Sequence, residues 1–414
     1  MRRCNRPGGA GMAAVLLIAA LVCGCTGTPS GDIDLAALDT GAYGVEPLEV
    51  PENDDPRLGR ILESVRMAEA LVDPAEVDPV LRSSAGAVGV IPLPTPVKVA
   101  STVLAEPIRD VLERHGMVAG VAVTGADKDF GAARPSVGSA RVLLVTVLRF
   151  PDPAAAQRAA VEIDAVDAAV NRDNVAVSVP EYPGAHGHWR PGVPTLAASN
   201  AHESYVVNVL VGDTTPDAAV MSALAAKAFD AQIRRLREFV PTPPDSMAAL
   251  PLDPEALVRR LIPQAPRRWE YPAVTAMSSQ RTAGWEAEMQ VTGVTFGPRA
   301  TYLLGRRDRP PTLEATARSG FNQIARHPDP AAARIAFDRA VGSDIGDGML
   351  PVEGPVGVPD VHCAENPDID LLALTRFVCR VLYDRYSVTL LAREVGSARQ
   401  RAAAQYGLLV NGDR

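Results

Sequence analysis

The 414-residue sequence contains only three lysines, five cysteines and nineteen aromatic residues (8 Phe, 8 Tyr and 3 Trp). Acidic residues outnumber basic ones by 49 to 41, which gives a formal net charge of −8. Nucleic acids are bound through a basic surface, so this balance argues against a nucleic-acid partner. Apolar residues make up 47 % and charged residues 22 %. These are globular proportions, and they exclude a disordered, collagen-like or multi-span membrane protein.

The sequence motifs of the common hydrolases are also missing. No serine has glycine at both the −2 and +2 positions, and neither Ser-x-x-Lys nor His-Glu-x-x-His occurs. There is no Cys-x-x-Cys pair and no phosphate-binding loop, so the sequence predicts no cofactor and no metal. Catalytic triads are defined by geometry rather than by sequence order. The missing motifs therefore weaken an enzymatic function without excluding it.

The N-terminus has the pattern of a bacterial lipoprotein signal. Three arginines in the first six residues precede a 12-residue apolar run, residues 11–22, which is too short for a membrane span of about 20 residues. The run ends in Val-Cys-Gly-Cys, and the small glycine before Cys25 resembles a lipobox. We expect residues 1–24 to be a signal peptide and Cys25 to be lipidated. The alternative is a plain signal peptide cleaved nearby, with Cys25 incidental.

Lipidation at Cys25 predicts attachment to the extracytoplasmic face of the cell membrane. A single acyl chain holds a protein marginally, whereas two or more anchor it stably. Without residues 1–24 the chain keeps 38 basic and 49 acidic residues, a net charge of −11. That charge repels anionic headgroups, so the membrane partner is reached through the lipid and not through electrostatics.

Cys363 and Cys379 are the two cysteines left after the N-terminal region is set aside. Outside the cytoplasm an even pair normally forms a disulfide. Closing this 16-residue separation contributes about 3 kcal/mol in the chain-entropy model. The alternative is a cysteine nucleophile, because His362 precedes Cys363. Adjacent residues on a strand point to opposite faces, which makes that adjacency a weak argument for catalysis.

A Pro-Asp-Pro-Ala-Ala-Ala segment occurs twice, within residues 150–158 and, 177 positions later, within residues 327–335. Each copy ends a strand-like run and begins an Ala-rich helix. The same order follows both copies: a short apolar segment, a Pro/Gly-rich loop, two strand-like stretches and a final helix. The repeat predicts two tandem, duplicated α+β domains, each with helices packed on a mainly antiparallel sheet.

Proline-rich segments, which interrupt the helical and strand periodicities, indicate the domain boundaries. Asp-Pro pairs indicate where helices begin, and glycines indicate where they end. The spacing of apolar residues predicts a helix from Pro56 to about residue 72 and another at about 101–115, closed by Gly116. The expected organisation is a signal peptide at 1–24, the lipidated cysteine and a tether at 25–36, an N-terminal domain at 37–240, a Pro-rich linker at 241–254 and a C-terminal domain at 255–414.

Residues 182–189 hold the densest group of side chains suited to a site. His186 and His188 could bind a metal, and Tyr182 and Trp189 could line a ligand groove. Two histidines are too few ligands for a closed zinc site. The segment is therefore interpreted as a Pro/Gly-rich loop whose aromatic side chains pack on the sheet.

Short motifs along most of the chain resemble a known family. They are the lipobox at Cys25, Leu38-Asp39-Thr40-Gly41-Ala42-Tyr43, Arg60 through Met67-Ala68 to Val77-Asp78-Pro79, Leu148-Arg149-Phe150-Pro151-Asp152, Phe296-Gly297-Pro298-Arg299, Cys363 with Phe377-Val378-Cys379, and Arg385-Tyr386. The pattern resembles the two-domain lipoproteins of unassigned function from mycolic-acid-bearing actinobacteria. The resemblance implies an extracytoplasmic, membrane-anchored protein, and it supplies no catalytic residues.

The sequence favours a non-enzymatic lipoprotein that binds an envelope ligand or a protein partner. The alternative is an envelope hydrolase with dispersed catalytic residues near His186 and His188, and a structural or accessory subunit is a third possibility. A cavity with a histidine beside a carboxylate favours the enzyme. A large apolar groove favours lipid-like ligands, and a flat apolar patch favours a protein partner.

Overall fold

The computed structural model describes residues 33–85, 89–130, 135–276, 289–305, 313–368 and 376–412. Cys25, the expected signal peptide and most of the expected tether lie outside these residues. Within the described ranges, none of the helices has both the length and the apolar character that crossing a membrane requires.

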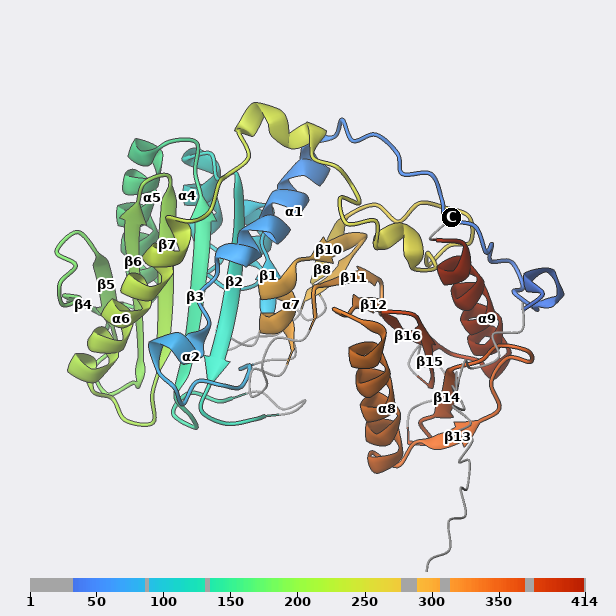
Figure 1. Cartoon of the computed structure of the whole chain (residues 1–414). Coiled ribbons are helices and arrows are strands. Elements are labelled where there is room, and N and C mark those ends of the chain that lie inside the picture. The colour runs from blue at the N-terminus through green and yellow to red at the C-terminus, as the bar shows by residue number, and fades with distance from the viewer. Residues whose placement is uncertain are drawn as a thin grey trace, which may run out of the picture. The chain divides into compact units, whose positions relative to one another are not determined.

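The N-terminal domain is built on a seven-stranded sheet in the order β1-β2-β3-β7-β6-β5-β4 (Figure 1). Every neighbouring pair of strands is antiparallel. Strands β2 and β3 are buried along their whole length. The strands are β1 (Val90–Pro92), β2 (Ala119–Ala126), β3 (Val142–Arg149), β4 (Val175–Val177), β5 (His186–Trp189), β6 (Thr195–His202) and β7 (Tyr205–Gly212).

The C-terminal domain repeats this arrangement in a second seven-stranded antiparallel sheet, ordered β10-β11-β12-β16-β15-β14-β13. Numbered along each repeat, the strands of both sheets follow one order, 1-2-3-7-6-5-4. This identity confirms the predicted duplication and the α+β class. The strands are β10 (Val294–Phe296), β11 (Ala315–Ser319), β12 (Asn322–Arg326), β13 (Leu350–Val352), β14 (Val361–Glu365), β15 (Phe377–Tyr383) and β16 (Tyr386–Ala392).

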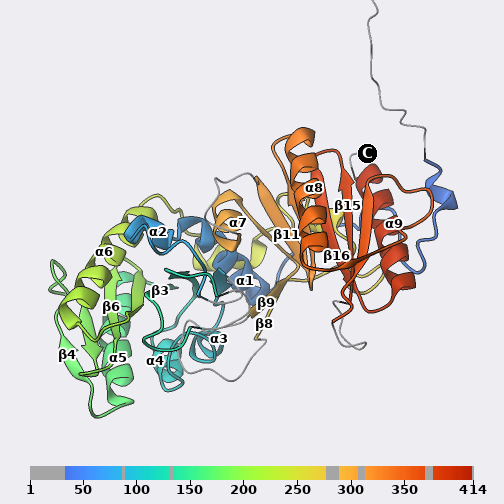
Figure 2. The ribbon, with the colours of Figure 1, turned by 90° about the horizontal axis from the view of Figure 1, so that it is seen from below.

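Each sheet lies between two long helices, one on either face (Figure 2). The predicted Pro-Asp-Pro caps are present at the start of the first helix of each repeat. Asp152 accepts a hydrogen bond from the Ala155 N–H at 2.8 Å, and Asp329 accepts one from the Ala332 N–H at 2.7 Å. These helices are α5 (Pro153–Ala169) and α6 (Ala218–Leu236) in the N-terminal domain, and α8 (Pro330–Gly346) and α9 (Val395–Asn411) in the C-terminal domain.

The registers of the two sheets allow the repeats to be matched residue by residue. Tyr205 stands opposite Arg149 in the β3–β7 pair, and Tyr386 stands opposite Arg326 in the β12–β16 pair. Arg149 and Arg326 each lie three residues before the capping aspartate of the helix that follows. Positions at equal steps from these pairs are therefore equivalent in the two domains.

The helices before the first sheet agree with the sequence only in part. Helix α1 (Pro56–Met67) begins at Asp55, whose side chain caps it, and a short η2 turn (Ala68–Ala70) and α2 (Pro74–Val77) follow. The single helix expected at 101–115 was wrong in its first half, because only α4 (Ile108–Arg114) is helical there. Pro107 stands at its N-cap and disfavours helical backbone in the residue before it. A separate short helix, α3 (Pro96–Ala100), lies upstream.

The Pro-rich segment between the domains is held against α1. Its η3 turn (Pro244–Ala249) passes so close to Gly59 that a Cβ added there would lie 2.3 Å from the Met247 carbonyl oxygen. Thr242 also donates its hydroxyl to Glu63 of α1 at 2.7 Å. Any side chain at residue 59 would push this turn away from the helix.

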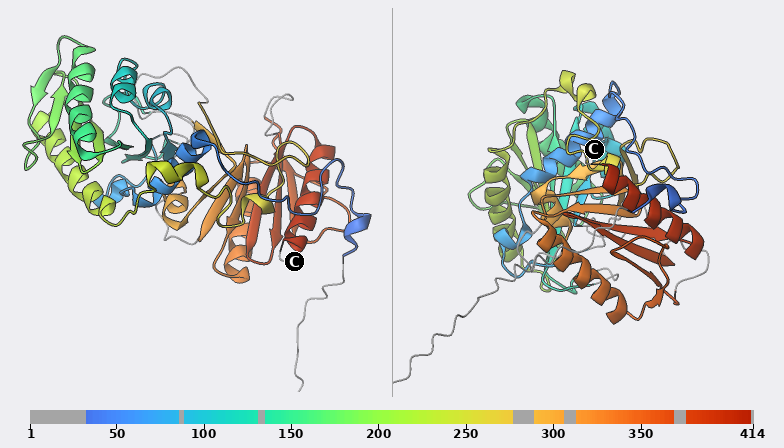
Figure 3. Two further views of the ribbon diagram at one scale, coloured as in Figure 1. Left: turned by 90° about the horizontal axis from the view of Figure 1, so that it is seen from above. Right: turned by 45° about the vertical axis from the view of Figure 1, so that its right-hand side comes forward.

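The segment before α1 packs on the C-terminal domain, beside α9 (Figure 3). Asn411 donates a hydrogen bond to the Val45 carbonyl at 3.1 Å, and Gln400 donates one to Asp39 at 3.0 Å. Gly407 faces Val45 without room for a Cβ, since one would lie 2.6 Å from the valine side chain. Residues 35–49, the strap, thus pack against α9.

Further contacts join residues of the two repeats. A small sheet of β8 (Ala273–Ala276) and β9 (Met289–Thr292) and the short helix α7 (Pro298–Leu304) contribute apolar side chains to the N-terminal core. Glu69 accepts hydrogen bonds from the backbone N–H groups of Arg299 and Ala300 at 3.1 and 2.9 Å. A carboxylate from the N-terminal domain therefore caps a helix of the following sequence repeat.

Candidate functional site

A cavity of about 530 Å³ lies in the N-terminal domain, on the face of the sheet that α5 covers. The end of α5, strands β5 to β7 and the turn after α3 form its walls. Its polar lining is Asp167, Asn171, Asn174, His188, Arg190, Thr195 and Asn208, and its main apolar lining is Val103, Leu104, Val137, Val170 and Leu210.

His188 connects strand β5 to helix α5 at the wall of this cavity. The residue is 8 % exposed, and its Nδ1 lies 2.8 Å from Oδ1 of Asp164. Its Nε2 lies 3.8 Å from Oδ2 of Asp167. The two aspartates are one helical turn apart, so they face the same side of α5 and hold the ring between them.

The two side chains that flank the His188 ring are both acidic. Burial raises the pKa of Asp167, and the neighbouring Asp164 adds to the rise while His188 opposes it. The C-terminal end of α5, at Ala169, adds a partial negative charge because its last carbonyls are unpaired within the helix. The His188 imidazole thus lies between two carboxylates, close to the C-terminal end of α5.

The floor of the cavity is a buried polar row on β6 and β7. Asn208 donates its side-chain amide to the hydroxyl of Ser199 at 2.9 Å, and the two residues are 2 % and 1 % exposed. At the rim, Asn174 donates its amide to the Ala168 carbonyl at 3.0 Å. These amides offer hydrogen-bonding groups without a full charge, next to the apolar side chains of the opposite wall.

The structure brings only part of the predicted Tyr-His-His-Trp cluster together. His188 and Trp189 line the cavity, whereas Tyr182 and His186 line a separate recess of about 250 Å³. Tyr182 donates its hydroxyl to Asp230 of α6, and its ring centroid lies 5.2 Å from that of Phe229. Burial and the contact with Asp230 raise the pKa of the Tyr182 hydroxyl. The loop interpretation of the segment was wrong for residues 186–189, which form β5.

A metal held by His186 and His188 would need further ligands, and the described part of the chain does not supply them. There, no group of three or more His, Cys, Asp and Glu side chains is arranged to hold a metal ion. The carboxylates nearest to His188 instead engage its ring nitrogens.

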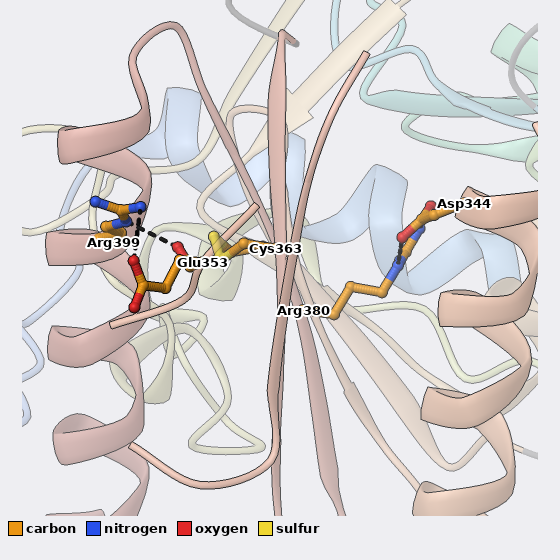
Figure 4. Close-up of a disulfide and its surroundings, with 6 residues drawn as sticks. Asp344, Glu353, Cys363, Arg380 and Arg399 are labelled. Atoms are coloured by element: carbon orange, nitrogen blue, oxygen red, sulfur yellow. Dashed lines mark hydrogen bonds and ion pairs between the residues drawn. A yellow bond between two sulfur atoms is a disulfide. The ribbon is translucent and has the colours of Figure 1, made fainter. Parts of the chain in front are cut away.

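In the C-terminal domain, Cys363 and Cys379 form the predicted disulfide (Figure 4). They stand opposite each other on β14 and β15, and both are buried. Cys363 is therefore not a free nucleophile beside His362. The matching residues of the N-terminal repeat are Gly187 and Ala198, which pair in the same register.

Arg380 follows the disulfide on β15 and points to the opposite face, toward α8 (Figure 4). Its guanidinium donates to both carboxylate oxygens of Asp344, each at 2.6 Å, and to the Thr389 hydroxyl at 3.0 Å. Such a bidentate pair is among the stronger hydrogen-bonded contacts in proteins. This pair joins the sheet to α8 at the level of the disulfide.

Sequence reasoning missed the acidic and amide residues of the cavity. Asp164 and Asp167 are visible only as two acids three residues apart on an Ala-rich helix, and Asn208 is a single polar residue in an apolar strand. Their meeting with His188 depends on strand pairing, which the residue pattern does not specify. The repeat itself was the one usable signal, because it aligns Asp167 with Asp344.

Two family descriptions match the chain. Residues 50–252 match the N-terminal part, and residues 279–412 the C-terminal part, of a domain of unknown function, DUF7373. No curated protein matches the chain. Among solved structures, the extracellular domain of PknH from Mycobacterium tuberculosis is similar at 14 % sequence identity and a TM-score of 0.26, covering 41 % of this chain and 94 % of that one.

Proposed function

The chain belongs to the DUF7373 family of domains of unknown function, and we propose that it is a ligand-binding protein of the cell envelope. The observation that carries the proposal is the cavity of about 530 Å³ beside α5. Small-molecule sites are typically concave, of about 300–1,000 Å³, with an apolar lining and a few placed polar groups. Asp167, Asn208 and His188 supply those polar groups against a wall of valine and leucine.

The arrangement around His188 supports binding rather than hydrolysis, the alternative function. A catalytic base needs one ring nitrogen aimed at the group from which it takes a proton. Here Nδ1 faces Asp164 and Nε2 faces Asp167. In the described ranges, no hydrogen bond connects either nitrogen to a serine, threonine or cysteine. The ring therefore links two carboxylates of α5 to strand β5.

We place the protein on the extracytoplasmic face of the cell membrane, anchored through lipid on Cys25. The lipobox supports the anchor, and the disulfide between Cys363 and Cys379 supports an oxidising compartment. The structure describes neither Cys25 nor the residues around it.

The ligand function is tested by photo-crosslinking in the native envelope. A benzoylphenylalanine replaces Val137, a half-exposed residue of the cavity wall, and a matched control variant carries it at Val356, which is 88 % exposed in the C-terminal domain. Intact-mass measurement after irradiation is expected to show a small-molecule adduct of defined mass at position 137 alone. The same adducts at both positions, protein adducts only, or none would overturn the proposal.

A further inference from the structure

The two repeats differ at one sheet position, which faces helix α5 in the N-terminal domain and helix α8 in the C-terminal domain. The side chain at this position determines whether the space between the sheet and the helix is filled. Ser199 stands opposite Asn208 in the β6–β7 pair, and Arg380 stands opposite Thr389 in the β15–β16 pair. Asn208 and Thr389 each lie three residues after the tyrosine that begins their strand. Ser199 and Arg380 are therefore equivalent, and so are their two partners.

The helix above this position carries the same acidic residue in both repeats. Asp167 and Asp344 each lie fourteen residues after the proline that begins α5 and α8. In the C-terminal repeat the side chain of Arg380 spans the gap from the sheet to this aspartate. In the N-terminal repeat the side chain of Ser199 ends at its hydroxyl, and the cavity between Asp167 and Asn208 occupies the gap.

The charges of the two repeats also differ. In the C-terminal repeat one carboxylate, Asp344, faces one guanidinium. The N-terminal repeat has a second carboxylate, Asp164, where the C-terminal repeat has Val341, and it has one imidazole in place of the guanidinium. Among the contacts of the described residues, Asp167 lacks the bidentate guanidinium partner that Asp344 has in Arg380, and its nearest cation-forming group is the His188 ring at 3.8 Å. The other charged residue of the lining, Arg190, is exposed at the rim.

We infer that the N-terminal cavity binds a small organic cation, whose guanidinium or ammonium group lies between Asp167 and Asn208 as the Arg380 side chain lies between Asp344 and Thr389. The inference rests on the proposed ligand-binding function and specifies the ligand's chemistry. The cationic group faces Asp167 and donates hydrogen bonds to its carboxylate and to the amide oxygen of Asn208. The rest of the ligand contacts the apolar wall formed by Val103, Leu104 and Leu210.

The inference is tested with n-propylguanidinium, which reproduces the side chain of arginine, and with n-propylurea, its uncharged isostere. Both are titrated calorimetrically into the full mature chain. The guanidinium is expected to bind at least about tenfold more tightly than the urea, the ratio that corresponds to one charge-assisted hydrogen bond.

Four variants locate the binding. Ser199→Arg copies the C-terminal repeat and is expected to abolish binding, while Thr215→Arg adds the same charge at an exposed residue away from the cavity and leaves binding intact. Asp167→Asn removes the carboxylate that the cation faces, so the preference for the guanidinium falls to about threefold or less. Ala197→Leu fills the cavity without a charge and abolishes binding of either probe, which keeps the test decisive if the Ser199 variant does not fold.

The outcomes separate the inference from the proposed function. Equal binding of both probes that is lost in Ala197→Leu would overturn the cationic ligand and keep the cavity as a ligand site. If neither probe binds while the crosslinker at Val137 captures a small molecule, the cationic ligand is likewise overturned and the cavity remains a ligand site. If neither probe binds and no small molecule is captured, both proposals are wrong. A guanidinium preference that survives Ser199→Arg and Ala197→Leu would place binding elsewhere and also overturn the inference.

Discussion

Glu63 on α1 and Arg149 on β3 form a buried ion pair, with Oε1 of the glutamate 2.6 Å from Nη1 of the arginine. Their side chains are 0 % and 6 % exposed. The glutamate also accepts hydrogen bonds from the backbone N–H and the hydroxyl of Thr242, at 3.1 and 2.7 Å. One carboxylate thus holds the first helix, a central strand and the start of the interdomain segment together.

Replacing Glu63 by alanine is expected to lower the free energy of unfolding by about 3–5 kcal/mol, because it leaves Arg149 as an uncompensated buried charge. Urea denaturation followed by circular dichroism measures the loss. The control is Glu113→Ala, which removes an exposed partner of Arg109 and should cost about 1 kcal/mol or less. Equal losses in the two variants would contradict the buried pair.

The double variant Cys363→Ala/Cys379→Ala is expected to lose about 3 kcal/mol of stability, since the disulfide restricts a loop of 16 residues in the unfolded chain. Intact-mass measurement under non-reducing conditions should first show the wild-type pair bonded. Reduction should destabilise the wild type and leave the double variant unchanged. Two free thiols in the oxidised wild type would refute the disulfide.

His327 is expected to make stability depend on pH. Burial lowers its pKa from the ordinary value of 6.5, with Asp329 partly opposing, and its Nε2 lies 2.8 Å from the Ser387 hydroxyl. The unfolded chain therefore takes up the proton first, and stability present above pH 6.5 is lost as the pH falls toward the folded pKa.

Phe150 occupies the equivalent position in the N-terminal repeat and is equally buried, so His327→Phe is the matched substitution. Urea denaturation at several values between pH 7.5 and 5 compares the two proteins. The wild type should lose more stability than the variant over this range. Parallel curves would show that His327 does not carry the pH dependence.

Cys25→Ala is expected to release the protein from membranes, because the proposed anchor is the lipid on this cysteine alone. Fractionation of cells followed by immunoblotting measures the distribution. Cys23→Ala is the control and should leave the protein in the membrane fraction. An unchanged membrane fraction in the Cys25 variant would refute the lipid anchor.

The duplicated α+β architecture could be predicted because its signals are local. The Pro-Asp-Pro caps at Asp152 and Asp329 set the start of two helices, and the strand-like runs follow both at similar distances. The strands β5 and β14 were missed for a physical reason. β5 has only four residues and contains Gly187, and its pairing with β4 and β6 stabilises it more than its own composition does.

The candidate site could be predicted only at His188 and Trp189. Asp167 and Asn208 of the cavity lining, and Asp164, which contacts His188, lie 19 to 25 positions from this pair in sequence. Which of them face one another depends on the register of the sheet and the rotation of α5. The disulfide was easier to predict, because an even pair of cysteines has a single possible connectivity.

The strap has a consequence for the order in which the protein folds. Asn411 donates to the carbonyl of Val45, 366 positions earlier, so this segment finds its partner only in a helix that is made much later. The N-terminal sheet can form while the ribosome is still adding the second repeat. Residues 35–49 can dock only after α9 has emerged, and until then they are open to chaperones and proteases.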